Sequence, residues 1–103
     1  MANMASNDAC VIFSEDATVH IKKQFFADLS EELNCEDYEH EVEEETDIYL
    51  IIFESKWNVP KEILKKLMKK WPMVEEIKGC CSEGSFYACY SFTQDREPTI
   101  YSV

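Results

Sequence analysis

A long stretch of negative charge, uninterrupted by any positive charge, constrains this chain more than any other feature. Between Gln24 and Ser55 it carries twelve carboxylates and neither a lysine nor an arginine. Such a run repels itself, so a folded domain has to present it to water or to a positively charged partner. It therefore indicates binding rather than chemistry. The carboxylates that we predict to contact a partner are Glu36, Asp37, Glu39, Glu41, Glu43, Glu44, Glu45 and Asp47.

Composition nevertheless favours a folded domain. Apolar residues make up 46% of the chain, and it has only two glycines and three prolines, which is unlike a disordered acidic tail. The 103 residues suit a single domain over residues 1–103, of which we expect residues 1–8 to be flexible. A net charge of −11 opposes direct binding to nucleic acid, because Lys and Arg supply the affinity for phosphate backbones.

Neither a signal peptide nor a membrane span is apparent in the sequence. The start of the chain lacks a basic segment followed by an apolar one, and the longest apolar run, residues 48–53, is too short to span a bilayer. We therefore expect a cytoplasmic protein that does not contact membranes. Its five cysteines, an odd number without CxxC spacing, favour reduced thiols over a disulfide framework. The adjacent Cys80 and Cys81 would point to opposite faces of a strand.

Hydrophobic periodicity predicts a strand and then a helix in the first third of the chain. Residues 10–13 form a short apolar run with two β-branched members, which is typical of a strand. Apolar residues then recur at helical spacing over residues 17–33. Ser14 or Asp16 can cap the start of this helix, and Asn34 suits its end.

The acidic segment and the apolar run after it predict a hairpin. Over residues 36–45 apolar and aromatic side chains partly alternate with glutamates, which indicates an edge strand with a charged outer face. Residues 48–53 are continuously apolar and rich in β-branched residues, which indicates a central strand. A turn near residues 45–47 would join the two strands.

A second helix is expected after Asn58. This residue can cap the helix, Pro60 fits its first turn, and Pro72 ends it. Its buried stripe comprises Ile63, Leu64, Leu67, Met68 and Trp71, and its basic outer face comprises Lys61, Lys65, Lys66, Lys69 and Lys70. We expect the basic face to be solvated and to neutralise part of the acidic charge.

Three strands complete the predicted fold. Residues 74–80 and 86–92 form a hairpin across a turn at residues 82–84, and residues 99–103 add a short edge strand. The side chains expected to share one face of the second strand are Phe86, Ala88, Tyr90 and Phe92. The predicted order is strand, helix, two strands, helix and two or three strands. This order predicts a ferredoxin-like α+β sandwich of two layers, with both helices on one face of a mostly antiparallel sheet.

Three short motifs lie in the second half of the chain. They are Phe53-Glu54-Ser55-Lys56-Trp57-Asn58-Val59-Pro60, Trp71-Pro72 and Cys81-Ser82-Glu83-Gly84-Ser85-Phe86-Tyr87-Ala88. Together with the opening Met1-Ala2-Asn3-Met4-Ala5-Ser6-Asn7, they resemble the signatures of the YubB-type ferredoxin-like proteins of plasmids and phages. In that family Trp, Pro and Glu are usual where this chain has Met4, Val59 and Ser82. The resemblance implies a fold and a mobile-element origin, and it implies no activity and no catalytic residue.

No complete catalytic, metal or cofactor motif is present in the sequence. Cys35, His40, Cys80 and Cys81 lack the short spacing of zinc ligands, and the acids around Cys35 disfavour a reactive thiolate. Neither His20 nor His40 has a nucleophile beside it. We therefore predict a protein that is not an enzyme and that holds neither a cofactor nor a metal.

Two functions from different classes fit these observations. In the first, the acids stand where phosphates stand, and the protein binds and inhibits a basic host protein, such as a nucleic-acid-binding or defence protein of the CRISPR-effector kind. In the second, the protein is a self-assembling scaffold or regulatory domain, which forms homodimers through its apolar strands or an open sheet edge. The acidic surface would then serve only solubility. Salt-sensitive binding to a nucleic-acid enzyme favours the first function, and dimerisation without a basic partner favours the second.

Overall fold

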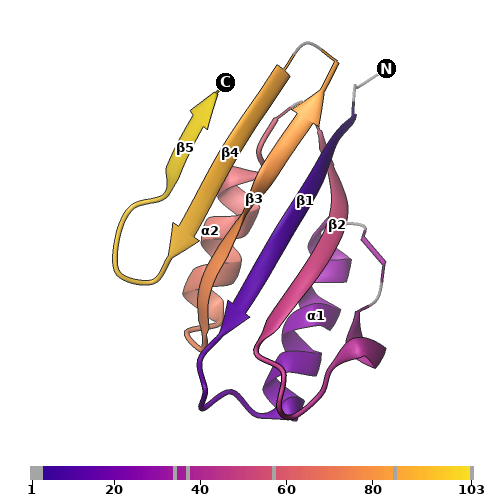
Figure 1. Cartoon of the computed structure of the whole chain (residues 1–103), viewed down its shortest axis with the longest axis vertical. Coiled ribbons are helices and arrows are strands. Elements are labelled where there is room, and N and C mark those ends of the chain that lie inside the picture. The colour runs from indigo at the N-terminus through magenta and orange to yellow at the C-terminus, as the bar shows by residue number, and fades with distance from the viewer. Residues whose placement is uncertain (1–3, 34, 37, 57, 85, 103) are drawn as a thin grey trace.

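In the part of the chain that the structure describes, five antiparallel strands form one sheet and two α-helices pack against one of its faces (Figure 1). The computed structural model describes residues 4–33, 35–36, 38–56, 58–84 and 86–102. The elements in chain order are β1 (Met4–Phe13), α1 (Val19–Leu33), the short 3₁₀ helix η1 (Glu39–Glu41), β2 (Ile48–Lys56), α2 (Lys61–Lys70), β3 (Val74–Glu83), β4 (Phe86–Thr93) and β5 (Thr99–Ser102).

The strand order across the sheet is β2-β1-β3-β4-β5, and each neighbouring pair is antiparallel. Because β2 and β3 both run antiparallel to β1, they are parallel to each other, and α2 is the crossover between them. The predicted two-layer α+β architecture is confirmed. The element order β-α-β-α-β-β-β, however, differs from the βαββαβ order of ferredoxin-like folds. The difference arises because the described residues of the range 36–45 form no strand and β3, β4 and β5 follow one another as a meander.

β1 is longer than the predicted strand over residues 10–13. It begins at Met4, so residues 4–8 belong to the sheet and are not a flexible segment as we expected, and residues 1–3 of that expected segment lie outside the described residues. A buried polar contact stabilises this first half of the strand. The amide of Asn7 donates to the Ser55 hydroxyl at 2.9 Å, and its carbonyl oxygen accepts a hydrogen bond from the Tyr90 hydroxyl, also at 2.9 Å. These partners offset the cost of burying a polar side chain in the core.

β2 lies at an edge of the sheet, so the prediction of a central strand was wrong. Its odd-numbered residues from Tyr49 to Phe53 are buried beneath the helices, whereas its even-numbered residues from Ile48 to Ile52 lie exposed on the opposite face. Leu50 is the most exposed of these apolar side chains, at 79%. A continuously apolar run is typical of a strand covered on both faces, and here only one face of the sheet is covered by helices.

The start of α1 is capped by Thr18, whose hydroxyl accepts a hydrogen bond from the backbone N–H of Ile21 at 3.2 Å. The predicted caps were therefore wrong, and the Ser14 hydroxyl instead accepts from the N–H of Asp16. The predicted C-terminal residue Asn34 lies outside the described residues.

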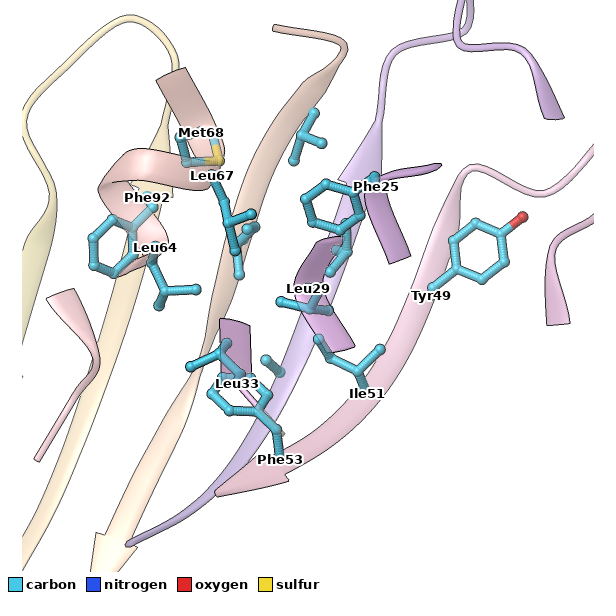
Figure 2. Close-up of a cluster of buried hydrophobic side chains, with 14 of the residues drawn as sticks. Phe25, Leu29, Leu33, Tyr49, Ile51, Phe53, Leu64, Leu67, Met68 and Phe92 are labelled. Atoms are coloured by element: carbon cyan, nitrogen blue, oxygen red, sulfur yellow. The ribbon is translucent and has the colours of Figure 1, made fainter. Parts of the chain in front are cut away.

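The second helix begins at Lys61 and ends at Lys70, close to its predicted bounds. Asn58 does not cap it, because its side-chain oxygen accepts a hydrogen bond from the N–H of Val59. Instead, Pro60 occupies the N-cap position, where no side-chain hydrogen bond is made. The predicted stripe is confirmed for Leu64, Leu67 and Met68, which are buried (Figure 2), whereas Ile63 and Trp71 are only partly buried.

The hydrophobic core fills the space between the two helices and the sheet (Figure 2). At the end nearest the acidic segment, the rings of Phe13, Phe25, Phe26 and Tyr49 pack edge to face, with neighbouring centroids 5.3 to 5.8 Å apart. Such aromatic pairs contribute about 0.5–1.5 kcal/mol each beyond the burial of their surface. The aromatic cluster therefore fixes α1 against β1 and β2.

The predicted β3–β4 hairpin is confirmed. Gly84 adopts a positive φ of 49° at the turn, a conformation that side-chain-bearing residues rarely adopt. Cys81 is buried and Cys80 lies on the opposite, uncovered face, as the alternation of a strand requires. The predicted inner face of β4 is also confirmed, because Ala88, Tyr90 and Phe92 are buried.

An isoleucine-to-alanine substitution should affect stability differently on the two faces of β2. Ile51 is 2% exposed and Ile52 is 63% exposed. We expect Ile51→Ala to lower the free energy of unfolding by about 3 kcal/mol through lost burial and a residual cavity. We expect Ile52→Ala to lower it by less than about 1 kcal/mol, mainly through lost β propensity. Urea denaturation of both variants measures the difference, and equal losses would contradict the burial assigned to β2.

Candidate partner-binding surface

The acidic segment forms the connection between α1 and β2, which runs along the β2 side of the molecule (Figure 1). The edge strand predicted over residues 36–45 was wrong. Residues 39–41 instead form the 3₁₀ helix η1, and the chain turns again before β2 begins. Contacts from the domain to the backbone of this segment explain the difference.

A buried lysine organises the end of the acidic segment. Lys22 of α1 is fully buried, and its ammonium donates to the backbone carbonyls of Glu43 and Glu44 at 3.3 Å and of Thr46 at 2.6 Å. The same ammonium lies 3.0 Å from the carboxylate of Asp47. A buried cation is tolerated only when it is paired and hydrogen-bonded. The backbone of the segment therefore turns inward toward Lys22.

Tyr49 holds the same turn from β2. Its hydroxyl accepts a hydrogen bond from the N–H of Glu43 at 3.1 Å and donates to the carbonyl of Thr46 at 2.7 Å. In Figure 2 this hydroxyl points away from the apolar cluster in which the Tyr49 ring packs. The Lys22 ammonium also lies 6.0 Å from the centroid of the Tyr49 ring, within the range of a cation–π interaction.

A second tyrosine joins the acidic segment to the free edge of the sheet. The Tyr38 hydroxyl accepts a hydrogen bond from the N–H of Ile52 at 3.0 Å and lies 3.4 Å from the carbonyl of the same residue. It thereby satisfies backbone groups of an edge strand that have no strand beside them. The acidic segment thus covers part of the β2 edge.

The structure places the predicted partner-binding acids in this one segment, with different exposures. Those with exposed side chains are Glu36, Glu41, Glu43, Glu44 and Glu45, and Glu39 is partly exposed. Asp47 is 34% exposed and pairs within the chain with Lys22. Asp37 lies outside the described residues. The exposed glutamates therefore surround a backbone turn that internal contacts fix.

Three shallow hollows meet at Tyr38. The first is lined by Glu36, Ile52 and Glu54, the second by Leu50 and Ile52, and the third by Glu41, Glu43 and Leu50, among others. We call this region the acidic–apolar surface, defined as Glu36, Tyr38, Glu41, Glu43, Leu50, Ile52 and Glu54, together with the exposed Glu44 and Glu45 of the adjoining turn. An apolar centre with a charged rim is the usual anatomy of a protein–protein interface.

Two other acids of the run lie on α1 and are neutralised by lysines of α2. Asp28 pairs with Lys70 and Glu32 with Lys66, each at 2.8 Å, as we expected of the basic face of α2. The Asp28 carboxylate also accepts a hydrogen bond from the Trp71 indole at 2.8 Å. Burial raises the pKa of Asp28, but the hydrogen bonds from Lys70 and Trp71 together with the positive charges of Lys70 and Lys66 outweigh it, and the pKa lies below 3.8. These acids connect the two helices and are not part of the acidic–apolar surface.

Sequence reasoning missed the residues that build this surface. Lys22 precedes Phe25, Phe26 and Leu29 by three, four and seven residues, so it lies on the buried stripe of α1. A lysine on that stripe was the available signal. The roles of Tyr38 and Tyr49 had no comparable signal, because their hydroxyls bond to backbone atoms that only the fold brings near.

In comparisons with known proteins, no family model, curated protein or solved structure matches this chain. Within the described residues, neither α1 nor α2 has the length and apolarity of a membrane-crossing helix. Among the same residues, no three His, Cys, Asp or Glu side chains are placed to hold a metal ion together. The function therefore has to be inferred from the geometry and charge of the surface itself.

Removing the buried cation should release the acidic segment. Lys22→Met keeps most of the buried stem but removes the ammonium that three backbone carbonyls and the Asp47 carboxylate share, and we expect it to lower the free energy of unfolding by about 3 kcal/mol. We also expect faster cleavage of the native protein by a glutamate-specific protease. Lys23→Met, at the exposed neighbouring position, is the matched control. Equal effects of the two variants would contradict the role of Lys22.

The Asp28 contacts predict a dependence of stability on pH. Because the pKa of Asp28 is lower in the folded protein than its ordinary value of 3.8, its contribution is fully present above that value and is lost as the pH falls through the folded pKa. We expect Asp28→Asn to be less stable than the wild type near neutral pH, by a margin that shrinks in acid. Urea denaturation across this range measures the margin, with exposed Asp16→Asn as control. A margin independent of pH would contradict the prediction.

Proposed function

We propose that this protein is a non-enzymatic binding module whose acidic–apolar surface recognises a basic surface of another protein. The observation that carries the proposal is the fixed backbone turn at residues 43–47, which presents exposed glutamates beside exposed Leu50. A pre-organised segment loses less conformational entropy on binding than a flexible acidic tail does. Charge complementarity would supply specificity and a fast association rate.

The sharper form of the proposal is phosphate mimicry. Glutamates held on a rigid turn would occupy positions that phosphates occupy in the basic channel of a cytoplasmic host protein that binds nucleic acid, including a defence nuclease of the CRISPR-effector kind. Carboxylates accept charge-assisted hydrogen bonds from Lys and Arg as phosphates do. The motif resemblance to proteins of plasmids and phages supports the mobile-element origin that such an inhibitor would have.

Self-assembly is the second candidate, and the exposed apolar residues of β2 favour it. In a two-fold symmetric dimer through this edge, the same patch would meet its own copy, and the acidic segments of both copies would be brought close together. Like charges at such distances oppose association. Tyr38 also occupies backbone groups of Ile52 that a second strand would need. These contacts favour a basic partner over a second copy.

A surface that serves only solubility would not explain the internal contacts. Solvated charge needs no fixed backbone, whereas here Lys22 and Tyr49 both bond to the acidic segment from inside the domain. Burying the Lys22 ammonium to hold this segment carries a desolvation cost, and an acidic loop that stayed flexible in solvent would not require it. The cost is understandable if a defined arrangement of the glutamates matters.

The test uses the purified protein as bait in a host lysate at low salt. We expect a nucleic-acid-binding protein to be captured, to elute in a salt gradient, and to be displaced by added duplex DNA. The variant Glu41→Gln, Glu43→Gln, Glu44→Gln, Glu45→Gln should weaken capture by at least about tenfold, because each lost charge pair contributes to steering and binding. The control removes the same four charges elsewhere, through Glu15→Gln, Asp16→Asn, Glu75→Gln and Asp95→Asn, which are all exposed positions.

Other results would decide between the candidates. Equal capture by the wild type and both variants, or no specific capture, would overturn the binding proposal. Concentration-dependent dimers in sedimentation that Leu50→Ser abolishes would support self-assembly instead. Capture that the loop variant and the control lose equally would show that net charge, and not the fixed turn, attracts the partner.

A further inference from the structure

Two cysteines face each other on the uncovered face of the sheet, away from the acidic–apolar surface. Cys80 of β3 and Cys89 of β4 are directly opposite in the strand register, and their sulfurs lie 3.0 Å apart. Both are free thiols and both are partly exposed to solvent. A small reagent in solution can therefore reach them without any opening of the core.

The backbone geometry suits a disulfide between this pair. Residues directly opposite in an antiparallel ladder have Cα atoms about 4.5–5.5 Å apart, inside the span of about 4.4–6.8 Å found for disulfides. Bond formation brings the sulfurs to about 2.05 Å, so they have to approach by only about 1 Å. Rotation of the two side chains provides this movement.

The strand that carries Cys80 is held firmly in place. A Cβ atom added at Gly79 would overlap the backbone of Asp8 and Ala9, so β3 lies unusually close to β1 at this point. Because β3 is paired on both sides, oxidation of the two thiols does not require a strand to move. The sheet thus pre-organises the two sulfurs.

The remaining cysteines lack this arrangement. Cys81 is buried on the opposite face, where burial raises the pKa of its thiol and makes it unreactive. Cys10 is opposite Leu50 and Lys78 in its two strand pairings, and Cys35 lies in the connection after α1. Selective oxidation is therefore expected at Cys80 and Cys89.

We propose that Cys80 and Cys89 form a reversible thiol–disulfide exchange site whose co-reactant is a small soluble disulfide such as oxidised glutathione. The Cys80 thiolate attacks one sulfur of the small disulfide, forming a mixed disulfide and releasing one small thiolate. The Cys89 sulfur gives up its proton and attacks Cys80, which releases the second small thiolate. The two protons pass to the released thiolates, so two protein thiols are oxidised and one small disulfide is reduced to two thiols.

Either thiol can donate the hydrogen bond between the two sulfurs, so Cys89 resolves the mixed disulfide when Cys80 attacks first, and Cys80 resolves it when Cys89 attacks first. The hydrogen bond with Cys80 raises the pKa of the Cys89 thiol. Transient disulfides of this kind occur in cytosolic proteins that respond to redox conditions.

The test equilibrates the full chain with reduced and oxidised glutathione at several ratios, followed by acid quenching and alkylation of free thiols. Under oxidising ratios we expect intact mass spectrometry to show the loss of two hydrogen atoms, and peptide mapping to show a Cys80–Cys89 link that reductant reverses. Cys10→Ser, on the same sheet face, is the matched control and should still form the link. Cys80→Ser and Cys89→Ser should instead accumulate a glutathione adduct on the remaining thiol of the pair.

The wild-type mapping keeps the proposal falsifiable even if a serine variant fails to fold. Separate glutathione adducts on Cys80 and Cys89 without a link between them would overturn it. A link that includes Cys10 or Cys35 would overturn it as well. The proposal is also overturned if Cys80 and Cys89 can still be alkylated at every glutathione ratio that oxidises Cys10.

Discussion

The candidate partner-binding surface depends on the ammonium of Lys22. This group is buried beside the aromatic cluster, and no carboxylate of α1 pairs with it in the described structure. It takes its acceptors from the backbone of residues 43–46 and from Asp47. A cation in that position needs several oxygens to offset its desolvation, and the acidic segment supplies them. The charge that repels itself along the chain is therefore partly compensated from inside the domain.

The fixed turn links stability to the proposed binding role. Tyr49 is part of the aromatic cluster through its ring and part of the turn through its hydroxyl. Tyr38 has a similar double role, because its hydroxyl satisfies the β2 edge and its side chain lies where three hollows meet. The glutamates thus project from a segment that the core holds in place. Exposed Leu50 and Ile52 add an apolar centre beside them.

The acidic–apolar surface and the Cys80–Cys89 pair occupy different regions of the sheet. The acidic–apolar surface lies at the β2 edge, whereas the Cys80–Cys89 pair lies on β3 and β4, with β1 between the two regions. Helices cover only the opposite face, so both regions remain accessible to a partner or a reagent. Tyr38 packs against the core, but the other side chains of both regions are exposed or partly exposed, so substitutions of these can test function with little effect on folding.

The sequence by itself determined the elements whose periodicity reports burial on one face: both helices, the β3–β4 hairpin and the opposite orientations of Cys80 and Cys81. It also determined that most of the acids in the run would face solvent, because burying so many unpaired carboxylates is too costly; the partly buried Asp28 and Asp47 are each paired with a lysine. Only the tertiary structure decided that β2 is an edge strand and that the part of 36–45 that the structure describes contains the helix η1 and no strand. Those outcomes depend on which strand pairs with β1 and on where Lys22, Tyr38 and Tyr49 meet backbone atoms distant in sequence. Local sequence patterns do not predict such contacts, so the fixed acidic turn could be recognised only in the folded structure.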